Sequence, residues 1–93
     1  MKEELLIDMS GLMDEESFHD YVSKKLNFPG YYGYNLDAFL DCITDEEQSS
    51  MPGRLVVEGL AELKHYLPKL YAGFVECLQN YCKEFPDRKV VLR

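Results

Sequence analysis

The segment YYGYNLDAFLDCIT, Tyr31 to Thr44, is the stretch around which the chain is arranged, because it joins a turn to a short helix with two aspartates on one side. Asn35 is a typical N-cap, and a rotation of 100° per residue places the apolar residues after it on one arc. Asp37 and Asp41 fall on the opposite arc. Leu40 lies at the edge between the arcs, and the pattern leaves open whether it packs inward or joins the carboxylates on an outer contact surface.

The outer arc of this helix is strongly acidic. Asp37 and Asp41 are spaced i, i+4, so a like-charge repulsion of about 0.2–0.5 kcal/mol acts between them. The stretch from Asp37 to Glu47 contains five acids and no base. Such a concentration of negative potential attracts cationic partners and speeds their association. Taken residue by residue, Asp45, Glu46 and Glu47 are typical of an exposed, solvated loop.

Two neighbouring carboxylates can also share acid and base roles in an enzyme. Asp37 and Asp41, however, lie one turn apart on a convex helix face, whereas catalysis requires a concave site that excludes water. His19 and His65 are isolated in helical segments, and the sequence contains no phosphate-binding loop or metal-binding motif. We therefore expect no enzymatic activity and no catalytic residue, cofactor or metal site. The helix dipole gives Asp37 a purely structural explanation, which Asp41 lacks.

Length and charge bound the possible partners. With 93 residues, 46% of them hydrophobic and 29% charged, the chain suits one globular domain over residues 1–93 and is too short for two cores. Its net charge of −7 argues against binding to nucleic acid or to an anionic membrane, since both require positive charge facing phosphate. A basic protein partner fits better. The sequence has no long apolar seam for self-association, so we expect a monomer when the protein is free.

The cysteines and the amino-terminal segment favour a cytoplasmic location. The sequence has three cysteines, an odd number, and no CxxC pair, which predicts reduced thiols at Cys42, Cys77 and Cys82. Cys77 and Cys82 could in principle form a disulfide, but five residues apart on a helix they point in different directions, so we expect them to be buried apolar filler. The amino-terminal MKEELLIDM has only a short apolar run interrupted by acids, so the sequence predicts neither a secretory signal nor a membrane span.

Hydrophobic patterning and turn residues predict the other elements. Strands are expected at 5–7, 54–58 and 89–92. One helix follows Asp14 as its N-cap and is stopped by Asn27, and others are expected at 36–44, 60–66 and 69 to about 83. The order is therefore βααβααβ, a small layered α/β domain with a three-stranded parallel sheet and about four helices.

The same patterns predict which side chains of the carboxyl-terminal elements are buried. One stripe of the last helix follows helical spacing and should cover a sheet face. The strand 89–92 has a β-branched centre that suits a buried parallel position. The residues of the helical stripe are Tyr71, Phe74, Val75, Leu78 and Cys82.

Three tyrosines, Tyr31, Tyr32 and Tyr34, precede the acidic helix. Tyrosines of this kind pack at the edge of a core more often than they form a binding surface. Tyrosine is nevertheless enriched at protein interfaces. The neighbouring acidic face makes a binding surface more plausible here than it would be for three tyrosines alone. Both interpretations stay open.

The acidic segment also carries a family resemblance. Its pattern YYGxNLDAxxDCxT closely resembles the central segment of the barstar family, intracellular inhibitors of a secreted bacterial ribonuclease. Outside this segment the resemblance is one of size and element order, and it extends over essentially the whole chain. It implies the barstar fold, which has the same βααβααβ architecture. The matching residues are Tyr31, Tyr32, Gly33, Asn35, Leu36, Asp37, Ala38, Asp41, Cys42 and Thr44.

What the resemblance implies is a protein inhibitor that acts by occlusion. The helix beginning at Asn35 would enter the active-site cleft of a small basic ribonuclease, with carboxylates standing where RNA phosphates bind. By position in the motif, Asp41 matches the family's principal anionic contact and Asp37 its neighbour. The other contact positions that the motif carries over are Tyr31, Gly33, Asn35 and Thr44.

Several residues depart from the family pattern. Leu40, which we include among the candidate partner-binding residues, replaces the tryptophan that precedes the second aspartate in barstar. Tyr34 replaces an acid, and residues 45–47 replace aromatic and mixed residues. Asn80 lies near a further carboxylate of the family's long helix, and no role is carried over to it. An alternative function is therefore that of a barstar-like acidic module that binds another basic nuclease, a toxin or a nucleic-acid-binding protein.

Overall fold

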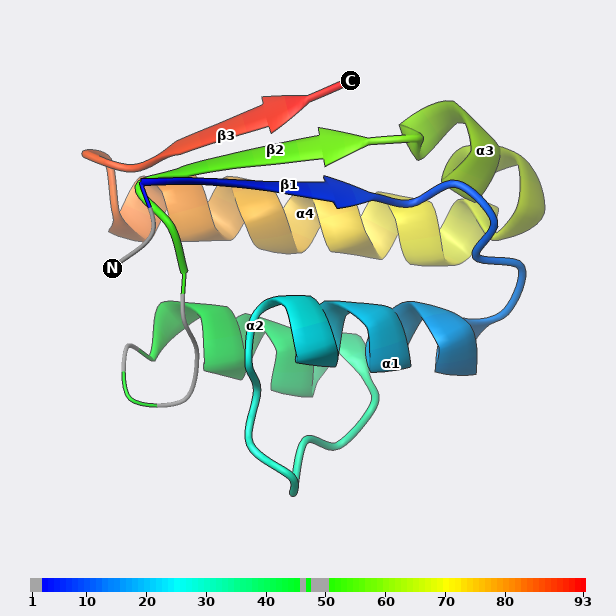
Figure 1. The fold of residues 1–93 in the computed structure, drawn as a ribbon, viewed down its shortest axis with the longest axis horizontal. Coiled ribbons are helices and arrows are strands. Elements are labelled where there is room, and N and C mark those ends of the chain that lie inside the picture. The colour runs from blue at the N-terminus through cyan, green and yellow to red at the C-terminus, as the bar shows by residue number, and fades with distance from the viewer. Residues whose placement is uncertain (1–2, 46, 48–50) are drawn as a thin grey trace.

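The computed structural model describes residues 3–45, 47 and 51–93, and these residues form a three-stranded parallel sheet and four helices (Figure 1). The predicted α/β fold class and the βααβααβ order are thereby confirmed. In chain order the elements are β1 (Glu4–Asp8), α1 (Glu15–Lys25), α2 (Leu36–Thr44), β2 (Arg54–Glu58), α3 (Leu60–Tyr66), α4 (Pro68–Glu84) and β3 (Lys89–Leu92).

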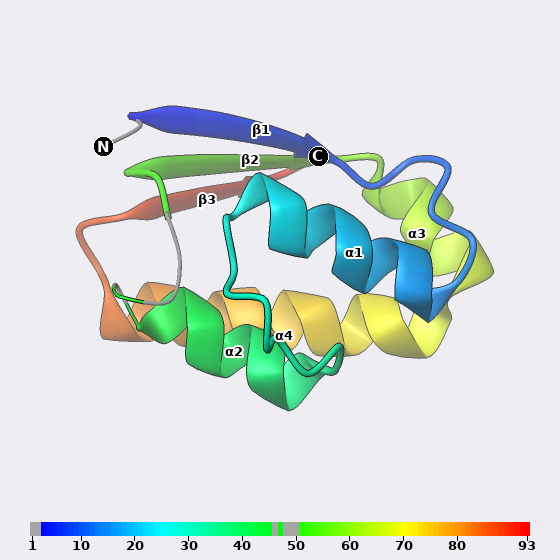
Figure 2. The ribbon, with the colours of Figure 1, turned by 60° about the horizontal axis from the view of Figure 1, so that its bottom comes forward.

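The sheet is parallel throughout, with β2 between β1 and β3. Its register aligns Leu6, Val56 and Val91 in one cross-strand row. The two crossover connections place α1, α2 and α4 on one side of the sheet, and α3 lies at the carboxyl ends of the strands (Figures 1 and 2). The opposite face of the sheet carries none of the described helices.

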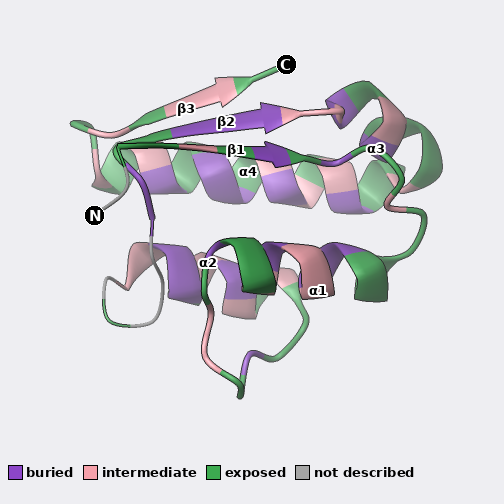
Figure 3. Cartoon of the chain, in the orientation of Figure 1, coloured by how far each residue is buried: buried purple, intermediate pink, exposed green. Residues whose placement is uncertain are grey.

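The hydrophobic core lies between the sheet and these helices. Phe18 of α1 and Phe39 of α2 contact Phe74 of α4 with ring centroids 5.0 and 5.5 Å apart, and all three side chains are fully buried. Figure 3 shows the buried positions along β2 and the inner sides of the helices. Phe74 therefore joins α1 and α2 within the core that also includes residues of the sheet. Burial of one phenylalanine side chain stabilises the fold by about 1.5–3 kcal/mol. The strands contribute Ile7, Leu55 and Val57 to this core.

Local signals set the helix ends as predicted. Asp14 caps α1, and its Oδ1 accepts a hydrogen bond from the Ser17 N–H at 2.7 Å. Asn27 follows α1 with a φ of 58°, a left-handed conformation that asparagine tolerates better than most residues. Leu67 ends α3 and precedes α4, which begins with Pro68, where the absence of an N–H costs nothing.

The predicted apolar stripe of α4 is only partly right. Phe74 and Leu78 are buried, but Tyr71, Val75 and Cys82 are half-buried. The buried arc of the helix is rotated because α4 packs against α2 as well as against the sheet. The fully buried residues of α4 are Leu70, Phe74, Cys77, Leu78 and Tyr81.

The prediction that residues 89–92 form a buried strand is wrong. β3 is an edge strand, in which Val90 and Val91 are half-buried and Leu92 is 44% exposed. β1 is also an edge strand: only Ile7 of its predicted apolar run is buried, and Leu6 is 46% exposed. Because β2 lies between β1 and β3, it is the strand of this sheet whose two edges are both paired.

Candidate functional site

α2 presents Asp37 and Asp41 to solvent because its other side is anchored in the core. Asn35 caps the helix as predicted, and its Oδ1 accepts a hydrogen bond from the Ala38 N–H at 2.7 Å. Asp37 and Asp41 are exposed, and neither carboxylate has an ion-pair partner among the residues that the structure describes. The buried residues of the opposite arc are Phe39, Cys42 and Ile43.

The amino end of α2 is held closely against α4. Leu36 packs over Gly73, where an added Cβ would overlap the Leu36 side chain. The Cys77 thiol donates to the Leu36 carbonyl oxygen at 3.7 Å. These contacts fix the position of the helix, so the aspartates project from a rigid element and not from a loop.

A hollow of about 490 Å³ lies between α2 and α4, beside Asp41. Leu40 is half-buried, and it both packs on the core and lines this α2–α4 hollow, which resolves the alternative that the sequence left open. The Thr44 hydroxyl donates to the carbonyl oxygen of Leu40 at 2.8 Å and lies 3.3 Å from that of Asp41. Its proton is therefore engaged within the helix. The hollow is lined by Leu40, Asp41, Thr44, Asn80, Lys83 and Glu84.

The contribution of α4 to this hollow was not predicted from the sequence. Lys83 and Glu84 had no assigned role, and Asn80 was considered without one. Their i, i+3, i+4 spacing places the three on one exposed side of α4. Nothing local in the sequence indicates that this side of α4 lies against α2, because the pairing of the two helices is a tertiary contact.

Three predicted contact residues lie at the amino end of α2 and do not line the hollow. Tyr31 is 78% exposed. The Asn35 side-chain amide donates to the Gly33 carbonyl oxygen at 3.1 Å, and a Cβ at Gly33 would lie 3.3 Å from Asn35 Nδ2. Gly33 therefore lets the loop pack tightly against the helix cap. The predicted contact residues thus form two groups, with Asp37 on the exposed face of α2 between them. One group precedes the helix, and the other lines the hollow: Tyr31, Gly33 and Asn35, and Leu40, Asp41 and Thr44.

Of the three tyrosines before α2, one packs in the core and two are exposed, so neither core packing nor an exposed surface describes all three. Tyr32 is buried, whereas Tyr31 is free of the core and Tyr34 is 43% exposed. Tyr34 has a φ of 50°, and its hydroxyl donates to Asp20 Oδ1 at 3.0 Å. Ion pairing with Lys24, at 3.0 Å, and the bond from Tyr34 lower the pKa of Asp20. Tyr34, which replaces an acid of the family pattern, therefore connects the loop before α2 to α1 through its hydrogen bond to Asp20.

A buried histidine of α1, His19, contacts the loop that precedes α2. His19 is 2% exposed, and its Nδ1 lies 2.6 Å from the Tyr32 hydroxyl. That hydroxyl also lies 3.5 Å from the carbonyl oxygen of Asn35. Burial lowers the pKa of His19, and the nearby Glu15 carboxylate opposes this in smaller measure. The neutral imidazole is therefore part of the structure that positions the start of α2.

We expect His19 to make folding stability depend on pH in the mildly acidic range below about pH 7. Since folding lowers the imidazole pKa, the stabilisation is complete above the unfolded pKa of about 6.5 and is lost as the pH falls through the folded pKa. Urea unfolding at a series of pH values measures this loss. The carboxyl pKa values of Asp8, Asp14 and Asp20 are lowered, so their effects fall below this window.

The His19→Gln variant should show a flatter dependence of unfolding free energy on pH in this range. The exposed His65 provides the matched control, and His65→Gln should keep the slope of the parent protein. An unchanged slope in His19→Gln would show that another group is responsible.

The remaining sequence predictions concern thiols, metals and membranes. None of the three cysteines forms a disulfide, and Cys42 and Cys77 are buried, which raises the pKa of both thiols. Cys82 is only half-buried, so its prediction as buried filler is wrong. No group of three or more His, Cys, Asp or Glu side chains is arranged to hold a metal ion within residues 3–45, 47 and 51–93. None of the helices in this part of the chain is long and apolar enough to cross a membrane.

Comparison with known proteins now supplies the family. Residues 3–93 match the family described as "Barstar (barnase inhibitor)". The chain belongs to the barstar family. A relative from Bacillus subtilis (strain 168), named "Putative ribonuclease inhibitor YrdF", is 32% identical over 89 residues, which cover 95% of this chain and 96% of the relative.

The segment after α2, where this barstar-family chain departs from the family pattern, helps to end the helix. Asp45 is the C-cap of α2, and its N–H donates to the Cys42 carbonyl oxygen at 3.3 Å. Its Oδ1 accepts from the Glu47 N–H at 2.9 Å. Glu46, predicted to extend the acidic loop, lies outside the described residues.

Proposed function

We propose that this barstar-family protein inhibits a small basic ribonuclease by inserting α2 into the active-site cleft of the enzyme. The observation that carries the proposal is the pair of exposed carboxylates, Asp37 and Asp41, on a helix that is capped and packed on its other side. The family match and the name of the Bacillus subtilis relative support ribonuclease inhibition as the general activity.

The physical basis is mimicry of phosphate by carboxylate. A ribonuclease must hold cationic side chains in its cleft to stabilise the transferring phosphate. Carboxylates accept the same charge-assisted hydrogen bonds from arginine, lysine and histidine. Asp37 and Asp41 lack an ion-pair partner within the described part of the chain, so binding breaks no internal salt bridge. An enzyme occupied in this way excludes RNA from its active site.

The two groups of predicted residues have different places in this complex. Asp41, Leu40 and Thr44 face the α2–α4 hollow, which has the size to receive one side chain of the enzyme. Tyr31 and Gly33, at the other end of α2, contact the rim of the cleft. The exposed Tyr31 ring offers a large contact area with little loss of conformational entropy.

Titration into activity assays of several small secreted microbial ribonucleases tests the proposal. We expect stoichiometric inhibition of at least one enzyme, with an association rate that falls as salt is added, since the encounter is electrostatically steered. Inhibition of none of them would contradict the ribonuclease assignment. Capture of a different basic protein that competes for the same acidic face would then favour the alternative target class.

A further inference from the structure

α4 carries an apolar arc that the sheet covers only in part. At 100° per residue, Tyr71, Val75, Leu78 and Cys82 fall within an arc of about 60°, next to the fully buried arc that faces the core. Tyr71, Val75 and Cys82 are only half-buried. The helix therefore carries more apolar surface than the three-stranded sheet encloses.

β3, the strand nearest to this arc, has one free edge. The Lys89 N–H donates to the carbonyl oxygen of Gly53, immediately before β2, at 2.9 Å, and the Arg93 N–H donates to that of Val57 in β2 at 2.8 Å. Backbone groups alternate in direction along a strand, so the N–H and C=O groups of Val90 and Leu92 face away from β2. Within the described residues no strand pairs with this side of β3. Such an edge is a template for strand addition.

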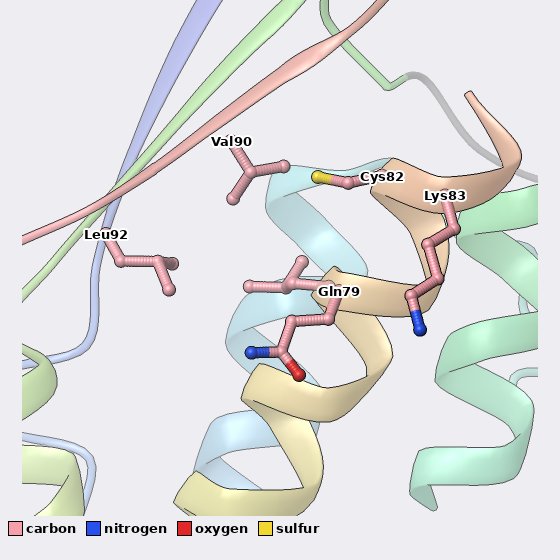
Figure 4. A pocket seen from close by; sticks show the side chains of 6 residues that line it. Gln79, Cys82, Lys83, Val90 and Leu92 are labelled. Carbon is pink, nitrogen blue, oxygen red and sulfur yellow. The ribbon is translucent and has the colours of Figure 1, made fainter. Parts of the chain in front are cut away.

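A groove of about 360 Å³ lies between the free edge of β3 and α4 (Figure 4). Val90 and Cys82 point toward one another across it, and Leu92 extends along the same side of β3. Its floor is therefore apolar, and two polar side chains of α4 stand at its margin. The residues that line this β3 groove are Leu78, Gln79, Cys82, Lys83, Val90 and Leu92.

The charges around the β3 groove favour a ligand that carries negative charge. Lys83 and Lys89 are exposed, and neither has an ion-pair partner in the described ranges, whereas Arg93 pairs with Glu58 at 3.1 Å. β3 itself contains one basic residue, Lys89, and no acid, and it is followed by Arg93, so pairing with β3 of a second copy would bring like charges together. An acidic segment meets complementary charge instead.

We propose that the β3 edge binds an extended acidic segment of a partner protein, which adds to the sheet as a fourth strand. Apolar side chains at alternate positions of that segment enter the β3 groove and cover the exposed arc of α4. The acidic side chains on the other face meet Lys89, and those at the margin of the groove meet Lys83. Main-chain hydrogen bonds to Val90 and Leu92 supply the affinity common to strand addition.

This surface is chemically opposite to the face proposed for the nuclease. α2 carries unpaired carboxylates, whereas the β3 edge carries the unpaired Lys89. Lys83 of α4 stands between the two surfaces and lines both the β3 groove and the α2–α4 hollow. The proposal is independent of ribonuclease inhibition, because it requires neither Asp37 nor Asp41. A protein that fails to inhibit any ribonuclease can still bind an acidic segment here.

The test uses a synthetic heptapeptide of alternating glutamate and valine, with a lysine–valine peptide of the same length as its control. Titration into the isotope-labelled protein should shift the amide resonances of Val90 and Leu92 and slow their hydrogen exchange. The glutamate peptide should produce these changes and the lysine peptide should not. Absence of changes at β3 at millimolar peptide, or equal changes with both peptides, would overturn the proposal.

Charge reversal at the exposed Lys89 tests the electrostatic contribution to binding without disturbing the core. Lys89→Glu should weaken binding of the glutamate peptide about tenfold, since one attractive surface contact becomes repulsive. Lys69→Glu is the matched control, because it makes the same change of net charge on an exposed residue near the amino end of α4. Equal weakening in both variants would contradict a specific site. Concentration-dependent dimers with protected Val90 and Leu92 amides would instead identify a second copy as the occupant.

Discussion

Asp41→Ala is expected to weaken inhibition of the target ribonuclease roughly a hundredfold to a thousandfold, or about 3–4 kcal/mol. In the complex, the cationic groups of the nuclease that face Asp41 are removed from water, and truncation leaves them buried without a counter-charge. Most of the effect should appear as faster dissociation, because mutations within one interface change off-rates more than on-rates. Kinetic binding measurements and inhibition titrations together measure it.

Two further variants give this experiment its controls. Glu16→Ala removes an equal charge from the first turn of α1, where Glu16 lines a separate hollow with Asp14 and Asp20, and inhibition should change little. Asp41→Asn keeps the shape of the side chain and should lose most of the affinity, because charge provides the interaction. Inhibition by Asp41→Ala at the level of the parent protein would place the contact site elsewhere.

Gly59→Ala is expected to lower the free energy of unfolding by about 2–5 kcal/mol, as the sum of backbone strain and overpacking. Gly59 joins β2 to α3 with a φ of 73°. A Cβ there would lie 2.5 Å from the Ser10 backbone nitrogen and 2.6 Å from Asp8 Oδ1. Those two atoms are themselves hydrogen-bonded at 2.9 Å, so the added methyl group forces the turn after β1 to move. Urea and thermal unfolding measure the loss.

Gly11→Ala separates the two components of that loss. Gly11 has a similar φ of 83°, but a Cβ there meets no atom within 4 Å. It should therefore incur only the strain of the left-handed conformation, about 1–2 kcal/mol. If the two variants were equally destabilised, the close approach of Gly59 to the turn after β1 would have no energetic role.

The features that sequence analysis predicted correctly are those with local causes. The bounds of β2, α3 and β3 and the cap at Asn35 follow from turn residues, proline positions and short apolar runs. The separation of Asp37 and Asp41 from the buried arc of α2 follows from helical periodicity alone. These features place the acidic face without any knowledge of tertiary contacts.

The features that were missed depend on how the layers pack. The burial of Tyr81 and the partial exposure of Val75 follow from the position of α4 against both α2 and the sheet. Lys83 reaches the hollow beside Asp41 only because α4 lies next to α2. The prediction of a buried β3 failed because β-branched residues suit edge and central strands alike, and strand order is not encoded in one strand.

The placement of all the described crossover helices on one side of the sheet has a practical consequence. β1 starts and β3 ends within the sheet layer, whereas α2 lies in the layer beyond α4 (Figure 1). A fluorescent tag or a surface linker attached on the face of the sheet that carries none of the described helices is therefore directed away from the acidic helix. Immobilised forms of the protein should keep α2 accessible, which makes it suitable as an affinity reagent for isolating its own target.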